Sequence, residues 1–466
     1  MKIVILGTGY VGLVSGVCFA DQGHNVICVD VDQQKIDLLK RGISPIFEPG
    51  LPELLASVMR ARKIDFTNNL PLALEGAAVV FIAVGTPPSP KDGSADLAHV
   101  FQAAEAIAMH AKQGTVVVIK STVPVGAGDR VEELFAKIRG KDDIAVVSNP
   151  EFLREGAAIS DFMTPDRVVV GTENQAAKRV MLEVYHKLVD KNVPLIFTRR
   201  RTSELIKYAS NAFLATKIAF INEMADLCES VDADINDLSL GMGLDHRIGG
   251  QFLKVGPGYG GSCFPKDTLA LTKLAAEHHT DLRLVETTVS SNLARKQSMA
   301  NRLAGLFDTD MAGKTVAVLG LSFKANTDDT RESPALALIA GLQKLETKIR
   351  AYDPVAMENA SDQLQGVKLC INPYQCALGA HAIVIATEWE EFKNLDFAKL
   401  RRQATGNVIL DLRNIINVKQ ATQNGFRVSR LGYAVDVDLS DDEKMDIEWK
   451  NDRPFETLQH IQDIRR

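Results

Sequence analysis

Short runs of β-branched and other apolar residues recur along the first two hundred positions, separated by stretches of helical periodicity. The runs cover residues 3–6, 26–30, 79–84, 115–119, 144–147 and 168–170. Because successive positions are apolar, these runs are typical of strands buried on both faces of a parallel sheet. The pattern predicts a doubly wound α/β domain of the Rossmann type over residues 1–200.

Between residues 202 and 238 the pattern becomes helical and stays helical. Its apolar positions, among them Leu205, Phe213 and Ile218, do not form one clean stripe. A helix that is apolar on most of its surface is buried on more than one side. We therefore interpret residues 201–300 as a central helical region that joins two domains and offers the interface of a homodimer.

The strand pattern returns after Lys314, with runs at 315–319, 348–352, 382–386 and 408–410. Residues 314–320, Lys-Thr-Val-Ala-Val-Leu-Gly, repeat the plan of residues 2–7, Lys-Ile-Val-Ile-Leu-Gly. We predict a second Rossmann-like domain over residues 301–437. Its glycine-rich turn has changed to Gly-Leu-Ser-Phe-Lys, which suits a different nucleotide-like ligand. The polar, acidic residues 438–466 are typical of a surface appendage or disordered tail, with a short helix expected near 457–464.

Composition narrows the class of protein. The chain has 466 residues, 46% of them hydrophobic, and a net charge of -6 with acidic and basic residues mixed. We expect a globular protein that binds no nucleic acid, because a concentrated basic face is missing. No apolar run approaches the roughly 18 residues of a membrane span, and the apolar start is too short for a signal sequence. Six scattered cysteines are typical of a protein in a reducing cytoplasm. No cluster of metal-ligating residues suggests a metal site. We expect Cys18 and Cys28 to lie in the core.

The segment Gly7-Thr8-Gly9-Tyr10-Val11-Gly12 lies between a predicted strand and a predicted helix. In this setting Gly7 permits the tight turn, Gly9 lets the backbone approach a pyrophosphate, and Gly12 lets the helix pack on the strand. Asp30 ends the second strand, where its carboxylate can bind a ribose diol and repel a 2′-phosphate. The pattern predicts NAD in preference to NADP. Lys35 is either a further cofactor contact or a solvated helix lysine.

Polar or glycine-rich segments follow the other strands of the first domain, at 85–88, 121–122 and 149–151. Ligands of doubly wound sheets bind outside the carboxyl ends of the strands, so these segments should meet in one crevice.

Residues 257–267, Pro-Gly-Tyr-Gly-Gly-Ser-Cys-Phe-Pro-Lys-Asp, carry the clearest chemical signal. The single thiol, Cys263, follows small and flexible residues and precedes the cation Lys266 and the carboxylate Asp267. A cysteine in electropositive surroundings is a strong nucleophile. Beside a nicotinamide, it predicts an oxidation through a covalent thioester.

Several motifs together resemble the nucleotide-sugar 6-dehydrogenases, the UDP-glucose/GDP-mannose dehydrogenase family. They are the segments 7–12, 85–87, 120–126, 149–156, 207–213, 257–267, 323–324 and 329–333. The resemblance covers roughly residues 1–435. It implies NAD-dependent, four-electron oxidation of UDP-glucose at C6 to UDP-glucuronate, with a Cys263 thiohemiacetal and thioester. GDP-mannose or another nucleotide sugar is the alternative substrate, and a catalytically silent NAD-binding protein is a third hypothesis.

The resemblance also implies roles for individual residues. Lys207 and Asn211, four apart on a helix and so on one face, would stabilise the alkoxide forming at C6; a surface lysine and a core-facing amide are the alternative. Asp267 would help water attack the thioester, unless it only pairs with Lys266. Glu151 and Thr122 would position that water or relay protons, although a carboxylate there could simply complement a helix dipole.

Further contacts follow by the same resemblance. The implied cofactor contacts are Gly7, Gly9, Tyr10, Val11, Gly12, Asp30, Lys35, Thr86, Ser121, Thr122, Glu155, Lys266 and Arg331. The implied substrate contacts are Glu151, Phe152, Leu153, Arg154, Glu155, Lys207, Asn211, Arg247, Phe252, Leu253, Lys254, Val255, Gly256, Gly260, Lys324 and Arg413. Arg247 matches a position that reaches the neighbouring subunit's substrate, whereas surface ion pairs are the plainer interpretation of Arg247 and Arg413. Arg331 would tie domain closure to NAD binding.

Overall fold

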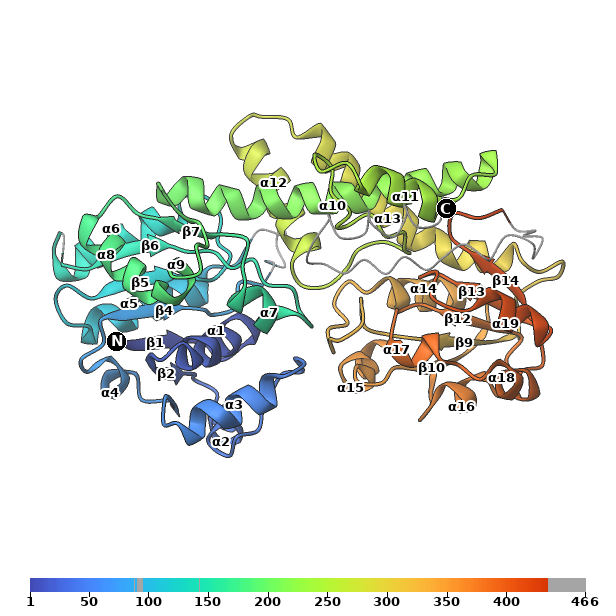
Figure 1. Cartoon of the computed structure of the whole chain (residues 1–466), viewed down its shortest axis with the longest axis horizontal. Helices are drawn as coiled ribbons and strands as arrows, with labels where there is room; N and C mark the ends of the chain where they lie inside the picture. The colour runs from blue at the N-terminus through green and yellow to red at the C-terminus, as the bar shows by residue number, and fades with distance from the viewer. Residues whose placement is uncertain (88, 90–94, 142, 435–466) are drawn as a thin grey trace, which may run out of the picture.

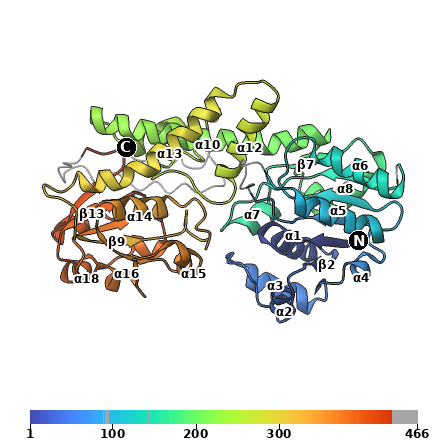
Figure 2. The ribbon, with the colours of Figure 1, turned by 180° about the vertical axis from the view of Figure 1, so that it is seen from behind.

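The computed structural model describes residues 1–87, 89, 95–141 and 143–434. Figure 1 shows two α/β lobes side by side, with one long helix, α10 (Arg200–Val231), running along both of them. The view from behind shows the same arrangement (Figure 2). The residues predicted as a tail, 438–466, and the last residues of the second domain lie outside the described part.

The first lobe is built on an eight-stranded sheet with the order β3-β2-β1-β4-β5-β6-β7-β8. Its strands are β1 (Lys2–Leu6), β2 (Asn25–Val29), β3 (Ile64–Thr67), β4 (Val79–Ile82), β5 (Val116–Ile119), β6 (Ala145–Ser148), β7 (Val168–Gly171) and β8 (Leu195–Thr198). All six predicted strands are present, with ends shifted by at most two residues. The two that were missed, β3 and β8, are edge strands.

The expectation of an all-parallel first sheet is wrong at one junction. The strands from β3 to β6 are parallel, but β7 runs antiparallel to β6, where Ser148 is opposite Gly171. β7 and β8 are then parallel to each other. The helix between β6 and β7, α7 (Ala158–Met163), has only six residues. A helix this short does not carry the chain back across the sheet, so β7 starts at the carboxyl edge.

Alternate residues of β1 supply the two faces of this sheet. Ile3 and Ile5 belong to a core that includes residues of α1, whereas Val4 and Leu6 belong to a core that includes residues of α5 and α6. The lobe is therefore doubly wound, as predicted. Its helices are α1 (Tyr10–Asp21), α2 (Gln33–Lys40), α3 (Leu51–Arg60), α4 (Leu70–Leu74), α5 (Ala98–His110), α6 (Ala127–Arg139), α7, α8 (Gln175–Val184) and α9 (His186–Val189).

The central region consists of α10, α11 (Ile235–Gly243), α12 (Phe264–Glu277) and α13 (Arg283–Ala304). The helix predicted over 202–238 is broken after Val231, where Asp232 adopts a left-handed conformation (φ 56°) and the side chain of Asp234 caps α11. The long helix contacts β6 and β7 of the first lobe, and its residues Ile221 and Ala225 belong to the core of the second lobe. It is the spine that the sequence predicted.

The second lobe has a six-stranded parallel sheet with the order β11-β10-β9-β12-β13-β14. Its strands are β9 (Thr315–Leu319), β10 (Lys348–Tyr352), β11 (Lys368–Leu369), β12 (Ala382–Ile385), β13 (Val408–Asp411) and β14 (Arg427–Arg430). Its helices are α14 (Pro334–Lys344), α15 (Met357–Ala360), η1 (Ser361–Gln363), α16 (Pro373–Ala377), α17 (Glu390–Lys393), α18 (Phe397–Gln403) and α19 (Val418–Gln423). The four predicted strands are present; the edge strands β11 and β14 were again missed.

The two lobes differ at the acid that follows their second strand. Asp353 follows β10 as Asp30 follows β2, but its carboxylate is fully buried. It accepts hydrogen bonds from the backbone of Leu321 and Ser322 and from the indole of Trp389. The carboxylate of Asp30 also accepts hydrogen bonds from the protein, but Asp30 is only partly buried, so it is more accessible to a ribose than Asp353. This agrees with the predicted change of ligand in the second lobe.

No helix within the described ranges is long and apolar enough to cross a membrane.

Candidate active site

The lobes meet through the loops that follow β6 and β9. The side chain of Glu155 accepts hydrogen bonds from Thr327 of the second lobe (3.1 Å) and from Ser262 of the central region (3.0 Å). A Cβ atom added to Gly156 would lie 2.6 Å from the carbonyl oxygen of Asn326, so the two loops are in direct contact. Strand ends from both sheets therefore meet at the cysteine-containing loop.

Two glycines let this loop pack against the second lobe. A Cβ atom on Gly260 would lie 2.4 Å from the carbonyl oxygen of Glu332, and one on Gly261 would collide with the ring of Phe323. The backbone N–H of Gly261 donates to the carbonyl of Arg331 (2.8 Å). The position of Cys263 is thus set by backbone contacts that larger residues would prevent.

Cys263 lies at the N-cap of α12, with its Sγ 3.5 Å from the hydroxyl of Ser262. Burial, together with the carboxylates of Glu151 and Asp267, raises the pKa of this thiol to about 11, although Lys207 lowers it in part. Carboxylates and cations both surround the thiol, because Lys324 and Arg331 of the second lobe interact with it as well as Lys207. In the free protein this cysteine is a neutral thiol.

Lys207 and Glu151 form a buried ion pair, with 3.0 Å between Nζ and Oε1 and exposed side-chain fractions of 3% and 4%. Burial opposes the charge of Lys207, but Glu151, Cys263 and Asp267 together raise its pKa above the ordinary value. Lys207 comes from α10 and Glu151 from the loop after β6. The pair holds a cation beside the thiol, which excludes the alternative of a surface lysine.

Asp267, which is 1% exposed, binds two partners. The side-chain amide of Asn211 donates to its Oδ2 (2.6 Å), and Lys266 donates to its Oδ1 (2.8 Å). Lys207 and Asn211 therefore use the same face of α10, as their spacing predicted. The salt bridge with Lys266 is present, and it exists alongside the contact between Asp267 and Asn211.

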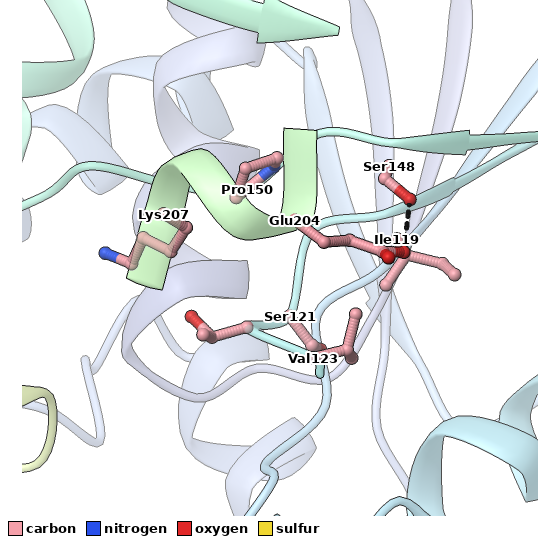
Figure 3. Close-up of a pocket in the computed structure, with 8 residues that line it drawn as sticks. Ile119, Ser121, Val123, Ser148, Pro150, Glu204 and Lys207 are labelled. Atoms are coloured by element: carbon pink, nitrogen blue, oxygen red, sulfur yellow. Dashed lines mark hydrogen bonds between the residues drawn. The ribbon is translucent and has the colours of Figure 1, made fainter. Parts of the chain in front are cut away.

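The segment around Thr122 lines a small pocket that also includes Lys207, Glu204 and Ser148. Figure 3 shows Glu204 and Lys207 leaving the same helix in opposite directions, with Glu204 bonded to Ser148. Glu204, which the sequence analysis missed, also accepts from the backbone N–H groups of Gly126 and Gly128. A buried carboxylate thus caps α6 and fixes α10 to the loop that carries Thr122.

Thr86 and Ser121 point to neighbouring backbone. The Thr86 hydroxyl donates to the carbonyl of Thr122 (3.0 Å), and the Ser121 hydroxyl donates to that of Val84 (2.7 Å). Both side chains tie the strand-end segments together.

The dinucleotide turn has the predicted form. Gly7 is left-handed (φ 97°), and a Cβ on Gly12 would lie 2.0 Å from the carbonyl oxygen of Gly7. A Cβ on Gly9 would meet no atom within 4 Å, so the backbone there is open to a ligand at the start of α1. This opening and the dipole of a 12-residue helix suit a pyrophosphate. The turn therefore fits NAD.

Asp30 is ready to act as an anion in this turn. Although burial opposes ionisation, hydrogen bonds from Thr8 and Asp32 hold the pKa of its carboxyl below the ordinary value. Its charge would repel a 2′-phosphate. Lys35 is partly exposed, lies 4.0 Å from Asp32 and also helps to lower the pKa of Asp30.

The other residues predicted on the first lobe make contacts within that lobe or with α10. Tyr10 hydrogen-bonds to Glu48, a residue that the sequence analysis missed, and its hydroxyl accepts from Gly156 N–H (2.9 Å). The ring of Phe152 lies 5.5 Å from the Nζ of Lys207. Arg154 forms an ion pair with Asp161 (2.6 Å). Val11 and Leu153 pack against the first-lobe core.

The second lobe contributes three of the predicted cationic side chains: Lys324, Arg331 and Arg413. Burial lowers the pKa of Lys324, and Glu155, Glu388 and Cys263 lie near enough to oppose that shift. Arg331 pairs with Asp329 (2.7 Å) and lies 3.7 Å from Glu155. Arg413 donates to the carbonyls of Phe323 (2.7 Å) and Ala386 (2.9 Å).

The residues of the segment 247–256 lie in different surroundings, some exposed and others buried in the second-lobe core. Arg247 is largely exposed and pairs with Asp245, so the single chain does not bring it to the thiol. Leu253 and Val255 are buried in the second-lobe core, whereas Lys254 is exposed. The ring of Phe252 packs 5.9 Å from that of Phe264. In this segment only Gly256 meets a predicted site residue, because its Cβ position lies 3.2 Å from Nη1 of Arg413.

A dinucleotide-binding lobe, a second Rossmann-like lobe and a half-buried thiol between them define a dehydrogenase whose substrate can be bound covalently. Family models of the UDP-glucose/GDP-mannose dehydrogenase family match the chain in three parts: the NAD binding domain at residues 1–189, the central domain at 201–294 and the UDP binding domain at 317–418. The chain belongs to this family, and it is an NAD-dependent dehydrogenase.

Named relatives agree with this assignment. The chain is 54% identical to a UDP-glucose 6-dehydrogenase of Rhizobium meliloti (strain 1021), covering 93% of this chain and 99% of the relative. It resembles the solved UDP-glucose dehydrogenase of Pyrobaculum islandicum, with a TM-score of 0.84, 36% identity and coverage of 93% and 98%. The GDP-mannose dehydrogenase of Pseudomonas aeruginosa is 30% identical, with a TM-score of 0.51 and coverage of 92% and 99%.

Proposed function

We propose that this protein oxidises UDP-glucose at C6 to UDP-glucuronate, with two NAD consumed for each product. The observation that carries the proposal is the placement of Cys263 beside the Lys207–Glu151 pair and near Asp267, where the two lobes meet. The greater identity to UDP-glucose dehydrogenases favours UDP-glucose over the alternative GDP-mannose. A silent NAD-binding protein would have no need for this buried arrangement of charges, which is costly to desolvate.

In the proposed reaction the residues of the chain hold the substrate and move its protons. Lys207 and Asn211 stabilise negative charge on O6 as the alcohol is oxidised. The thiol of Cys263 then adds across the aldehyde carbonyl: sulfur bonds to C6, and the proton goes to O6 to give a thiohemiacetal. The aldehyde carbon keeps its hydrogen and becomes a tetrahedral carbon bearing a hydroxyl, which is the arrangement that the second oxidation needs. Bound NAD supplies the hydride acceptor for each oxidation.

The second oxidation leaves a thioester on Cys263, which water cleaves. We assign Asp267 to assist the attacking water, with Glu151 and Thr122 positioning it or relaying protons. Hydrolysis breaks the C–S bond, forms the carboxylate and returns the proton to the thiol. The firm hold of Asn211 and Lys266 on Asp267 supports a fixed orientation for this carboxylate.

The remaining predicted contacts keep their roles as part of this proposal. Lys324 and Arg413 would bind the diphosphate or sugar, and Arg331 would link closure of the second lobe to NAD. The contact of Glu155 with Thr327 and Ser262 supports such a link, because it joins all three regions of the chain. The predicted division at residues 200, 300 and 437 is also retained, and the ranges of the family models support the first two boundaries.

We further propose a homodimer formed through α10. The exposed face of this helix carries large apolar residues, several of them seven positions apart: Leu205, Phe213, Phe220, Leu227 and Val231. Such a row marks an interaction surface, and the exposed Arg247 would then reach the partner's substrate. Sedimentation equilibrium at micromolar concentration should give twice the chain mass of 50.8 kDa. A monomer would contradict the proposal.

We place the protein in the cytoplasm. Cys263 must remain reduced in order to attack an aldehyde, and a reducing compartment keeps it so.

The proposed function is tested by the number of NADH molecules formed for each UDP-glucose consumed. Purified protein with excess NAD should form two NADH for each UDP-glucose consumed, because both oxidations occur before release. Absorbance gives NADH, and chromatography gives the acid. A parallel assay with GDP-mannose distinguishes the two substrates. One NADH per sugar, or faster turnover of GDP-mannose, would show that the proposal is wrong.

A further inference from the structure

The loop that precedes Cys263 is held by polar side chains from two helices of the central region, α10 and α13. Both hydrogen-bonding groups of Gly256 are bound: its N–H donates to Oδ1 of Asn222 on α10 (2.9 Å), and its carbonyl accepts from Nε of Arg295 on α13 (2.7 Å). We call Asn222 and Arg295 the Gly256 clamp. One residue of the loop is thus fixed from two directions.

The side chain of Arg295 is also bound to α10, the helix that carries Asn222. Nη1 of Arg295 donates to the backbone carbonyl of Asn222 (3.0 Å) and to the carboxylate of Asp226 (2.9 Å). Asn222 is 2% exposed and Arg295 is 8% exposed. Buried hydrogen bonds of this kind are costly to break, because the partner left behind loses water as well. The clamp therefore allows Gly256 little movement.

A second pair of bonds repeats the arrangement three residues further on. The side chain of Asn292, also on α13, accepts from Tyr259 N–H (2.8 Å) and donates to the Tyr259 carbonyl (3.1 Å). A Cβ on Gly258 would lie 2.8 Å from Oδ1 of Asn292. Helices α10 and α13 therefore hold this loop at both ends of the segment 256–259.

Gly256 matters because of its neighbour Arg413. The Cβ position of Gly256 lies 3.2 Å from Nη1 of Arg413, whose Nε and Nη2 are bound to backbone carbonyls. The loop and the guanidinium are thus neighbours near the carboxyl end of β13. If Gly256 moved, the surroundings of Arg413 would change.

We infer that Asn222 and Arg295 are positioning residues for the nucleotide-sugar site: they hold Gly256 against Arg413 and so set substrate affinity without contacting the substrate. This inference rests on the proposed function, since it takes Arg413 and Gly256 as parts of the substrate site. It adds two residues that no motif in the chain singles out.

The variants Arg295→Met and Asn222→Leu test the clamp in the full-length protein. Each should raise KM for UDP-glucose about tenfold, which corresponds to the loss of one buried hydrogen bond. KM for NAD should change by less than about twofold, because the dinucleotide turn is in the other lobe. Asn222→Asp keeps an acceptor for the Gly256 N–H and should remain within about threefold of the wild type.

The matched control is Arg302→Met. Arg302 is also on α13 and joins it to α10 through Glu229 (2.8 Å), but it binds no part of the loop. Loss of Arg302 should leave KM for UDP-glucose unchanged, whatever it does to stability in urea. An equal rise of KM in Arg302→Met, or an unchanged KM in folded Arg295→Met or Asn222→Leu, would overturn the inference.

Calorimetric titration with UDP separates the clamp from the reaction. Arg295→Met and Asn222→Leu should bind UDP about tenfold more weakly than Arg302→Met. If the wild type bound UDP but did not oxidise UDP-glucose, the proposed function would be wrong, and the UDP titration would still support or overturn the clamp. Equal UDP affinity in all three variants would overturn it.

Discussion

Cys263→Ser should reduce steady-state turnover of UDP-glucose by about 10³-fold or more, while binding of UDP-glucose and NAD remains close to that of the wild type. A hydroxyl is a far weaker nucleophile than a thiol, so the aldehyde is not captured and the second oxidation stops. At most one NADH per site should form in a rapid-mixing experiment. Turnover near the wild-type rate would show that no thioester is needed.

Cys228→Ser is the matched control for this substitution. Cys228 is buried in the second-lobe core on α10, remote in sequence from the catalytic loop. Its replacement should lower stability, because a hydroxyl is buried, but should leave the two-NADH stoichiometry intact.

The pH dependence of alkylation tests the ionisation state of Cys263 in the wild-type protein. With a pKa of about 11, the thiolate fraction of Cys263 rises about tenfold for each pH unit between pH 7 and 10. Its rate of alkylation by iodoacetamide in the absence of NAD should rise in the same proportion. A rate independent of pH over this range would mean that the thiol is already ionised.

Lys207→Met should lower kcat for UDP-glucose by about 10²–10³-fold, since it removes the cation expected to stabilise the oxyanion at C6. The same change should slow alkylation of Cys263 at pH 8, because Lys207 lowers the pKa of the thiol and its loss raises that pKa further. Stopped-flow absorbance and mass spectrometry measure the two effects. Unchanged kcat would exclude Lys207 from the chemistry.

A double variant separates chemistry from folding. Lys207→Met alone leaves the buried Glu151 without its 3.0 Å partner, which should cost about 3 kcal/mol of unfolding free energy. Lys207→Met combined with Glu151→Gln removes both charges and should recover much of that stability in urea. Turnover should not recover. If activity returned together with stability, Lys207 would have only a structural role.

Most of the fold could be predicted from local patterns in the sequence. The apolar runs identified ten strands, all of them present, because a strand buried on both faces is apolar at every position. The four missed strands, β3, β8, β11 and β14, are at sheet edges, where this signal weakens. The reversal of β7 could not be predicted for a different reason: the direction of a strand depends on the path of the chain between strands.

Much of the candidate site was also predictable. The cysteine loop, the glycine turn and the spacing of Lys207 and Asn211 are local features, and the structure brings Lys207 and Asn211 to the cysteine loop. The signal for Asn222 and Arg295 was weak, because polar residues on a mostly apolar helix look like its solvated face. Only their burial distinguishes them.

The amino-acid sequence by itself determined the two Rossmann-like lobes, the dinucleotide turn and the thiol, because each depends on residues that are neighbours along the chain. Tertiary structure decided which distant groups meet. Glu151 and Lys207 are 56 positions apart, as are Asn211 and Asp267, and each pair is in hydrogen-bond contact. It also decided that Cys263 is a neutral thiol in the free protein, because a pKa depends on burial and on charges that folding brings near.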